Sequence, residues 1–129
     1  MNTLIVDDDF LSRLLIQKIL ATYGSCHMAV NGKEAVEAVR LALDSSDPYD
    51  LICLDIMMPE MNGQQALKEI RALERAKAAR QKAKIIMTTA LADAENVVKA
   101  LQGECDYFLV KPIRRSALLE VLCKIGTAV

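Results

Sequence analysis

The sequence contains few residues that interrupt helices and strands: its 129 residues include 5 glycines and 3 prolines. It also has a single histidine. With 53% hydrophobic and 26% charged residues, it falls among compact globular proteins rather than disordered or fibrous ones. Its 4 cysteines show no CxxC or other metal-ligand spacing, which argues against a zinc site. We therefore expect free core thiols and a reducing compartment.

Long apolar runs and a strong net charge are also missing. No stretch approaches the roughly 20 apolar residues that cross a bilayer, and no basic segment precedes an apolar one at the start of the chain. We therefore expect no membrane contact and a cytoplasmic location. A formal net charge of -1 gives no global field for nucleic acid, so no direct DNA binding is expected. The length suits one domain over residues 1–129.

Short apolar runs alternate with segments of helical periodicity along the chain. The runs predict strands over 3–6, 25–30, 51–55, 85–88 and 107–110, and the periodicity predicts helices over 10–23, 33–43, from 62 onward, 94–102 and 115–125. Five strands alternating with five helices predict an α/β fold whose parallel sheet has helices on both faces. We expect the flavodoxin-like, doubly wound strand order 2-1-3-4-5.

Two helices carry more specific expectations. In the first helix the apolar spacing predicts an inward stripe made of Phe10, Leu14, Leu15, Ile19 and Leu20. The third helix is expected to end in a basic run from Arg75 to Lys84. Such a run indicates either a nucleic-acid patch or solvated cations that suit the negative end of the helix dipole, and we favour the second interpretation.

Polar residues of reactive or ligand-binding types stand where the predicted strands end. Asp7 and Asp8 follow the first strand, Asp55 ends the third, Thr89 ends the fourth and Lys111 follows the fifth. In an open parallel sheet these positions share one edge, close to the point where the strand order reverses. The predicted order therefore brings three carboxylates into one pocket, beside a hydroxyl and an ammonium group.

Three neighbouring carboxylates repel one another, so this pocket predicts a bound cation. Oxygen ligands without Cys or His favour Mg²⁺ over zinc or a soft metal. Mg²⁺ held in this way normally shares a phosphate. Asp55 would then be a nucleophile toward a phosphoryl group, and Lys111 and Thr89 would bind the phosphoryl oxygens.

The motifs that carry these residues resemble the receiver domain of two-component response regulators, of the stand-alone chemotaxis type. They are IVDDD with Arg13 in the following helix, LDIMMPEMNG, IIMTTA and YFLVKP, in the family's order and spacing along the whole chain. The resemblance implies that Asp7 and Asp8 are the acidic pair that binds Mg²⁺ together with Asp55. It also implies that the backbone carbonyl of Met57 completes the metal shell and that Asp55 accepts a phosphoryl group from a phosphohistidine.

The resemblance further implies a switch and two kinds of partner. Thr89 would be the switch hydroxyl, Phe108 the switch aromatic and Lys111 the phosphate-contacting lysine, while the Lys111–Pro112 bond resembles the family's cis peptide. The phosphodonor would be a sensor histidine kinase or a histidine phosphotransfer protein. A downstream protein would bind the face formed by the fourth helix, the fifth strand and the fifth helix. No catalysis is expected beyond the domain's own phosphorylation and dephosphorylation.

Two features depart from the family's pattern. Arg114 and Arg115 stand at the start of the last helix, where the family often has an acidic or capping residue and where cations are unfavourable. Met57 and Leu91 are apolar at positions close behind the phosphoacceptor and the switch hydroxyl, where many relatives carry polar side chains. The lifetime of the phosphoryl group is therefore open.

Other functions are compatible with parts of the pattern. A flavodoxin-like cofactor binder would share the fold, but the aspartates after the first strand would repel its phosphate. A haloacid-dehalogenase-type phosphatase also uses an aspartyl nucleophile, but it has a second acid two residues later, where this chain has Met57. A receiver-shaped scaffold that is never phosphorylated would be expected to lose a key residue, and none is missing.

Overall fold

The protein, described here by a computed structural model over residues 1–90 and 104–126, is built on a single sheet of five parallel strands. The strands are β1 (Asn2–Val6), β2 (Ser25–Ala29), β3 (Leu51–Asp55), β4 (Lys84–Thr89) and β5 (Tyr107–Val110). Their order in the sheet is β2-β1-β3-β4-β5, which confirms the predicted topology. The order reverses between β1 and β3, so the edge of the sheet beyond these two strands is the expected position of a functional site.

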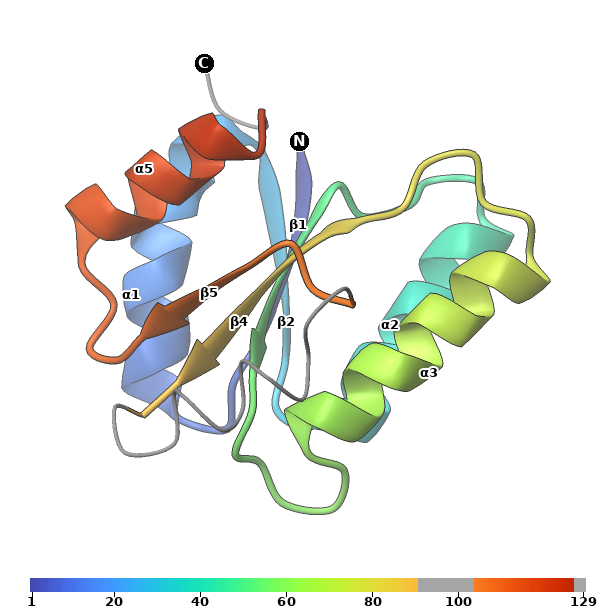
Figure 1. The fold of residues 1–129 in the computed structure, drawn as a ribbon, viewed down its shortest axis with the longest axis horizontal. Coiled ribbons are helices and arrows are strands. Elements are labelled where there is room, and N and C mark those ends of the chain that lie inside the picture. The colour runs from blue at the N-terminus through green and yellow to red at the C-terminus, as the bar shows by residue number, and fades with distance from the viewer. Residues whose placement is uncertain (91–103, 127–129) are drawn as a thin grey trace.

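Helices cover both faces of the sheet (Figure 1). They are α1 (Phe10–Leu20), α2 (Gly32–Asp44), α3 (Gly63–Ala76) and α5 (Arg115–Lys124), with a short 3-10 helix, η1 (Ala21–Tyr23), after α1. Figure 1 shows α1 and α5 on one face and α2 and α3 on the other. The helix predicted over 94–102 lies outside the described residues. Within those residues, no helix has both the length and the apolar character needed to cross a membrane.

Two apolar cores lie on opposite faces of the sheet, and the strands contribute to them alternately. In β3, Ile52 and Leu54 pack with α2 and α3, whereas Leu51 and Cys53 pack with α1 and α5. All five residues of β3 are buried. Because successive side chains of a strand point to opposite faces, a continuous apolar run is the pattern that serves both layers.

Three of the four α-helices in the described residues begin with a side-chain cap. Asp9, Asn31 and Asn62 each accept a hydrogen bond from the backbone amide three residues later, which satisfies an amide that the helix itself leaves free. Arg114, at the start of α5, makes no such bond. The start of α5 therefore lacks the side-chain cap that the other three described α-helices have.

The predicted inward stripe of the first helix is partly wrong. Phe10 is 64% exposed and Leu15 is 43% exposed, whereas Ile16, Ile19 and Leu20 are buried. Phe10 and Ile19 are nine residues apart, about two and a half helical turns, so their side chains point to opposite sides. The helix also ends at Leu20 rather than at residue 23, because the last three predicted residues form η1.

The basic run after the third helix is also placed differently from our expectation. Helix α3 ends at Ala76, and Ala78 has a positive φ of 51° that stops the helical path. Arg80 and Lys82 therefore lie in the loop before β4, and Lys84 is the first residue of that strand. The helix dipole falls off within the last turn, so it does not account for these cations.

The four cysteines form no disulfide bond, and they are not all in the core. Cys53 is buried, Cys26 and Cys105 are partly buried, and Cys123 is exposed. Burial raises the pKa of the Cys53 thiol to about 12, so this thiol is unreactive at neutral pH.

Candidate functional site

The three predicted carboxylates meet at the carboxyl ends of β1 and β3. One oxygen each from Asp7, Asp8 and Asp55 lies within 4.8 Å of the other two. The pairing of Val6 with Leu54 brings the ends of the two strands side by side, and the acidic residues follow directly. Asp7 and Asp55 are only 1% and 3% exposed, whereas Asp8 is exposed.

Lys111 extends from the end of β5 into this acidic cluster. Its Nζ lies 2.9 Å from Asp7 Oδ2 and 3.3 Å from Asp55 Oδ2. Its backbone amide donates to the carbonyl of Thr89 at 2.7 Å, which ties β5 to the end of β4. The Lys111–Pro112 peptide bond is cis, as the family resemblance implied. The structure thus brings together the carboxylates and the ammonium group that the sequence predicted.

The oxygen atoms of Asp7 suit a cation in addition to Lys111. Asp7 Oδ1 accepts a hydrogen bond from the backbone amide of Asp9 at 2.9 Å. Asp7 Oδ2 is buried, and within the described residues no donor makes a well-aligned hydrogen bond to it, although the Lys111 ammonium is in ion-pair range. A buried carboxylate oxygen with spare capacity, next to two further carboxylates, is the all-oxygen donor set that Mg²⁺ prefers.

The charges in the cluster set the pKa of Asp55. Burial and the nearby Asp7 carboxylate raise this pKa to about 6, while Lys111 acts in the opposite direction. Burial lowers the pKa of Lys111, but the Asp7 and Asp55 carboxylates outweigh burial and the pKa is raised. At neutral pH, Asp55 is therefore mostly ionised and Lys111 is charged.

A tight loop after β3 fixes the backbone of Asp55. The Gly63 amide donates to the carbonyl of Ile56 at 2.8 Å, so the chain turns back on itself. A Cβ atom at Gly63 would lie 2.2 Å from the carbonyl oxygen of Asp55, closer than side-chain carbons come to backbone atoms. Met57 is 64% exposed on the same loop. Only glycine at position 63 therefore allows α3 to begin this close to Asp55.

The two residues expected to form a switch lie on neighbouring strands. Thr89 is 1% exposed, and its hydroxyl donates to the carbonyl of Ala90 at 3.3 Å. Phe108 lies opposite Met87 in the pairing of β5 with β4 and is 37% exposed. In this structure the Thr89 hydroxyl therefore has a local partner, and Phe108 reaches the surface.

A shallow groove runs beside Lys111. It has a volume of about 420 Å³ and is lined by Asp9, Leu11, Ser12, Leu15, Ala90, Lys111, Pro112 and Ile113. Leu11 is 70% exposed, and the neighbouring Phe10 is 64% exposed. Because large apolar side chains gather here at the rim of the acidic cluster, the groove is a candidate contact surface for a partner.

Arg71 forms a buried ion-pair network that the sequence analysis missed. Its guanidinium donates to Glu74 Oε1 at 2.8 Å and to Asp106 Oδ2 at 3.2 Å. It also donates to the backbone carbonyls of Ala83 and Glu104, both at 2.9 Å. Arg71 and Glu74 are 5% and 4% exposed. The available signal was their spacing, since each stands four residues after a core residue of α3, Leu67 or Ile70.

The fold and the acidic cluster define a class of protein. The chain matches the response regulator receiver domain model over residues 3–123 and belongs to that family. It is thus a receiver domain of two-component signalling, and the predicted family is confirmed.

The chain is similar to relatives of two kinds, namely chemotaxis proteins of about its own length and much longer sensor kinases. The chemotaxis protein CheY of Thermotoga maritima is 36% identical over 127 residues, which cover 97% of this chain and 97% of that protein. Hybrid signal transduction histidine kinase L of Dictyostelium discoideum is 35% identical over 127 residues, which cover 97% of this chain but 7% of the kinase. The sensor protein GacS of Pseudomonas syringae pv. syringae is 37% identical over 124 residues, 95% of this chain and 13% of GacS. The chain therefore spans nearly all of one relative and a small part of the other two.

Solved receiver structures have the same fold. The receiver domain of the Arabidopsis thaliana histidine kinase CKI1, complexed with Mg²⁺ and BeF3-, has a TM-score of 0.83 and 28% identity, covering 98% of this chain and 89% of that one. The receiver domain of Ssk1, crystallised with the phosphotransfer protein Ypd1 of Saccharomyces cerevisiae, has a TM-score of 0.82 and 27% identity, covering 98% and 88%.

Proposed function

We propose that Asp55 is the phosphoryl acceptor of this receiver domain. The observation that carries the proposal is the position of its carboxylate, buried at the end of β3, next to Asp7 and 3.3 Å from the Lys111 ammonium. A nucleophile needs to be ionised, and a pKa of about 6 leaves Asp55 mostly in its carboxylate form at pH 7. Asp7 and Asp8 would serve as metal ligands rather than nucleophiles.

The chain's own residues account for most of the transfer step. A carboxylate oxygen of Asp55 forms a bond to phosphorus while the bond between phosphorus and a phosphohistidine nitrogen breaks, and the bonding electrons return to the imidazole ring. The barrier depends on alignment and charge neutralisation, because the phosphoryl group itself carries most of the charge. Lys111 lies close enough to both buried carboxylates to neutralise part of that charge.

The acidic cluster would hold Mg²⁺ through Asp7, Asp8 and Asp55, with the backbone carbonyl of Met57 as a further oxygen ligand. The spare capacity of Asp7 Oδ2 and the all-oxygen donor set support this assignment. When bound, the metal would neutralise the carboxylates and the incoming phosphoryl oxygens. The receiver domain of CKI1, which shares this fold, was crystallised with Mg²⁺ and BeF3-.

Thr89 and Phe108 would convert phosphorylation into a change of surface. The Thr89 hydroxyl is bonded only weakly to its neighbour's carbonyl at 3.3 Å, so a phosphoryl oxygen on Asp55 could recruit it. Its inward movement would leave space for Phe108 to turn from the surface toward the core. A downstream protein would then bind the face that includes β5 and α5, together with the fourth helix predicted from the sequence.

The groove beside Lys111 would receive the phosphodonor. Leu11 and Leu15 offer apolar contact area at its rim, and the groove leads to the residue that contacts Asp55. A sensor histidine kinase or a histidine phosphotransfer protein suits this position, because its phosphohistidine has to reach the acidic cluster. The domain would catalyse its own phosphorylation and dephosphorylation and no reaction of an outside substrate. Its cytoplasmic location remains a prediction from the sequence.

Intact-mass measurement tests the acceptor. We expect acetyl phosphate and Mg²⁺ to add the mass of one phosphoryl group to the wild type, and Asp55→Asn to abolish the addition because the amide is a poor nucleophile. Glu69→Gln, which alters an exposed carboxylate on α3, is the control and should label normally. Labelling that persists in Asp55→Asn would assign the nucleophile to another residue.

A further inference from the structure

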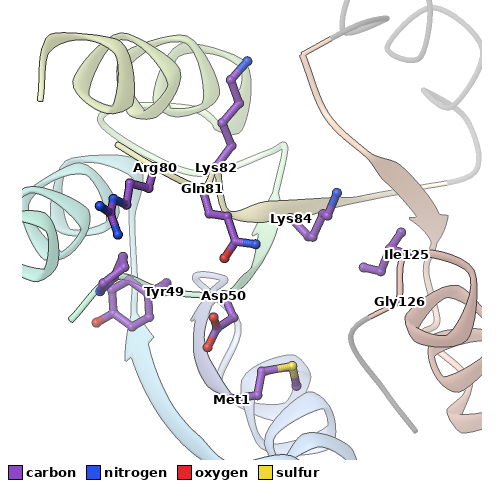
Figure 2. A pocket seen from close by; sticks show the side chains of 10 residues that line it. Met1, Tyr49, Asp50, Arg80, Gln81, Lys82, Lys84, Ile125 and Gly126 are labelled. Atoms are coloured by element: carbon purple, nitrogen blue, oxygen red, sulfur yellow. The ribbon is translucent and has the colours of Figure 1, made fainter. Parts of the chain in front are cut away.

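A second cavity lies at the end of the sheet opposite to Asp55 (Figure 2). Its volume is about 790 Å³, and it is lined by Met1, Pro48, Tyr49, Asp50, Arg80, Gln81, Lys82, Lys84, Ile125 and Gly126. Asp50 directly precedes β3 and Lys84 begins β4, whereas the acidic cluster lies where these strands end. The cavity is thus separate from the phosphorylation site and needs an explanation of its own.

The lining is rich in cations that lack partners. Within the described residues, the side chains of Arg80, Lys82 and Lys84 make no ion pair and no hydrogen bond with another residue. Among the described lining residues Asp50 carries the one carboxylate, and its Oδ2 already accepts a hydrogen bond from the Asn2 amide at 2.7 Å. The described part of the lining therefore carries more positive than negative charge, and no described residue pairs with its three cations.

Figure 2 shows how these side chains are arranged. In this view the Gln81 amide lies between the Arg80 guanidinium and the Lys84 ammonium, and the Asp50 carboxylate lies beyond it. The Lys82 ammonium points away from the other three. Arg80 and Lys84 thus lie on opposite sides of Gln81 and would contact different parts of a ligand, while Lys82 adds positive charge at the rim.

Hydrogen bonds hold the backbone at the end of this segment, at Ala83 and Lys84. The Ala83 amide donates to Glu74 Oε2 at 2.7 Å, and the Ala83 carbonyl accepts from Arg71 at 2.9 Å. The Lys84 amide donates to the carbonyl of Asp50 at 2.9 Å. The backbone of Lys84 is therefore ordered before a ligand binds, which lowers the entropic cost of binding there.

We propose that this cavity binds a small molecule that carries a diphosphate group, through Arg80, Lys84 and the amide of Gln81. The volume lies within the range of about 300 to 1,000 Å³ typical of small-molecule sites. The arginine fork matches phosphate oxygens, and a lysine supplies a point charge for a second phosphate. A hollow lined by few cations favours a small ligand over nucleic acid, which needs a longer series of basic residues. The site is independent of the function proposed for Asp55.

Titration with inorganic pyrophosphate tests the site. The full chain is titrated in EDTA at constant ionic strength, and backbone amide shifts are followed by NMR. We expect saturable shifts at Asp50, Gln81 and Lys84, and we expect the double variant Arg80→Gln, Lys84→Gln to bind at least about tenfold more weakly. The matched control is Lys33→Gln, Lys68→Gln, which removes two exposed cations of α2 and α3 and should leave the affinity unchanged.

A third variant should act in the opposite direction. Asp50→Asn removes the lining's carboxylate but keeps an oxygen that can accept from the Asn2 amide, so pyrophosphate should bind several-fold more tightly. Unchanged or weaker binding in Asp50→Asn would contradict the site. So would shifts centred on Asp55 and Lys111, equal weakening in both double variants, or no saturable binding up to about 10 mM pyrophosphate.

Discussion

The ionisation of Asp55 opposes folding. Burial and the Asp7 charge raise its pKa to about 6 in the folded protein, whereas an unfolded aspartate has a pKa of about 3.9. The folded state therefore holds its proton more tightly, and stability is lost as the pH rises from about 4 to about 6. The charge that Asp55 would need as a nucleophile thus costs free energy at neutral pH.

Asp55→Asn should stabilise the metal-free protein in a pH-dependent way. We expect a gain of about 2 kcal/mol at pH 7.5 that shrinks toward zero near pH 4, because asparagine removes the buried charge. Urea unfolding in EDTA at several pH values measures the gain. The exposed Glu69→Gln should show no such trend, and a pH-independent gain in Asp55→Asn would contradict the assigned cause.

Thr89→Ala separates phosphorylation from its readout. Thr89 is neither the nucleophile nor a metal ligand, so the variant should still be labelled at Asp55 by a small phosphodonor. It should lose most of the phosphorylation-dependent gain in affinity for a downstream partner, because no hydroxyl remains to follow the phosphoryl oxygen. Binding measured with and without phosphorylation decides the matter, and an equal gain in the two proteins would rule out the coupling.

The residues of the acidic cluster could be predicted because each one ends a strand. Their positions follow from the topology alone, and the chemistry follows from their types. Arg71 could not be found in this way, because a lone arginine on a helix is normally solvated. Its burial depends on the Ala83 carbonyl and on Asp106, which are distant in sequence and become neighbours only in the folded chain.

At the scale of elements, the Arg71 network joins α3, the loop before β4 and the segment before β5. Glu74 binds Arg71 with one oxygen and the Ala83 amide with the other, and Asp106 also accepts from the Ile85 amide at 2.8 Å. These contacts align the start of β4 with the start of β5. The network therefore stabilises the fold at the end of the sheet opposite to the acidic cluster.

Arg71→Ala should destabilise the protein by about 3 to 5 kcal/mol, because it leaves the buried Glu74 carboxylate without its partner. Chemical denaturation measures the loss. The control is Arg75→Ala, an exposed position on the same helix, which should change stability by no more than about 0.5 kcal/mol. A loss below about 1 kcal/mol in Arg71→Ala would mean that water replaces the guanidinium.

The strands and their order were predictable, whereas the end of α3 was not. Residues 76–84 are mostly alanine, lysine and arginine, and such residues favour a continued helix. Bonds to Glu74 at the end of α3 override this preference. The Ala79 amide donates to the carbonyl of Glu74 at 2.9 Å and the Ala83 amide donates to its side chain, so the chain turns back toward the sheet. Residue propensity carries no information about these specific bonds.

At the scale of the whole molecule, the two ends of the sheet have opposite charge. The acidic cluster lies where β1 and β3 end, and cations without a partner among the described residues lie where β3 and β4 begin. Each end therefore attracts a ligand of a different kind, a metal cation at one and a phosphorylated molecule at the other. Both would bind the folded state only, so both should raise its stability.

Mg²⁺ should raise the melting temperature of the protein, because it relieves repulsion among Asp7, Asp8 and Asp55 that exists only in the folded state. A thermal titration measures the rise. Asp8→Asn should remove most of it, since this exposed carboxylate adds little to the fold but would supply a metal ligand. Asp50→Asn, at the other end of the sheet, should keep the full rise. An unchanged rise in Asp8→Asn would show that the metal binds elsewhere.

The tight loop behind Asp55 has a consequence for sequence variation. A Cβ at Gly63 would meet the Asp55 carbonyl at 2.2 Å, and a Cβ at Gly32 would meet the Met61 carbonyl at 2.3 Å, so both clashes involve backbone that cannot rotate away. By contrast, a Cβ at Gly126 would meet no atom within 4 Å. In a randomised library selected for phosphorylation, almost all surviving variants should therefore have glycine at positions 32 and 63. The loop that positions the nucleophile would be among the slowest parts of this chain to diverge, although it is exposed at Met57.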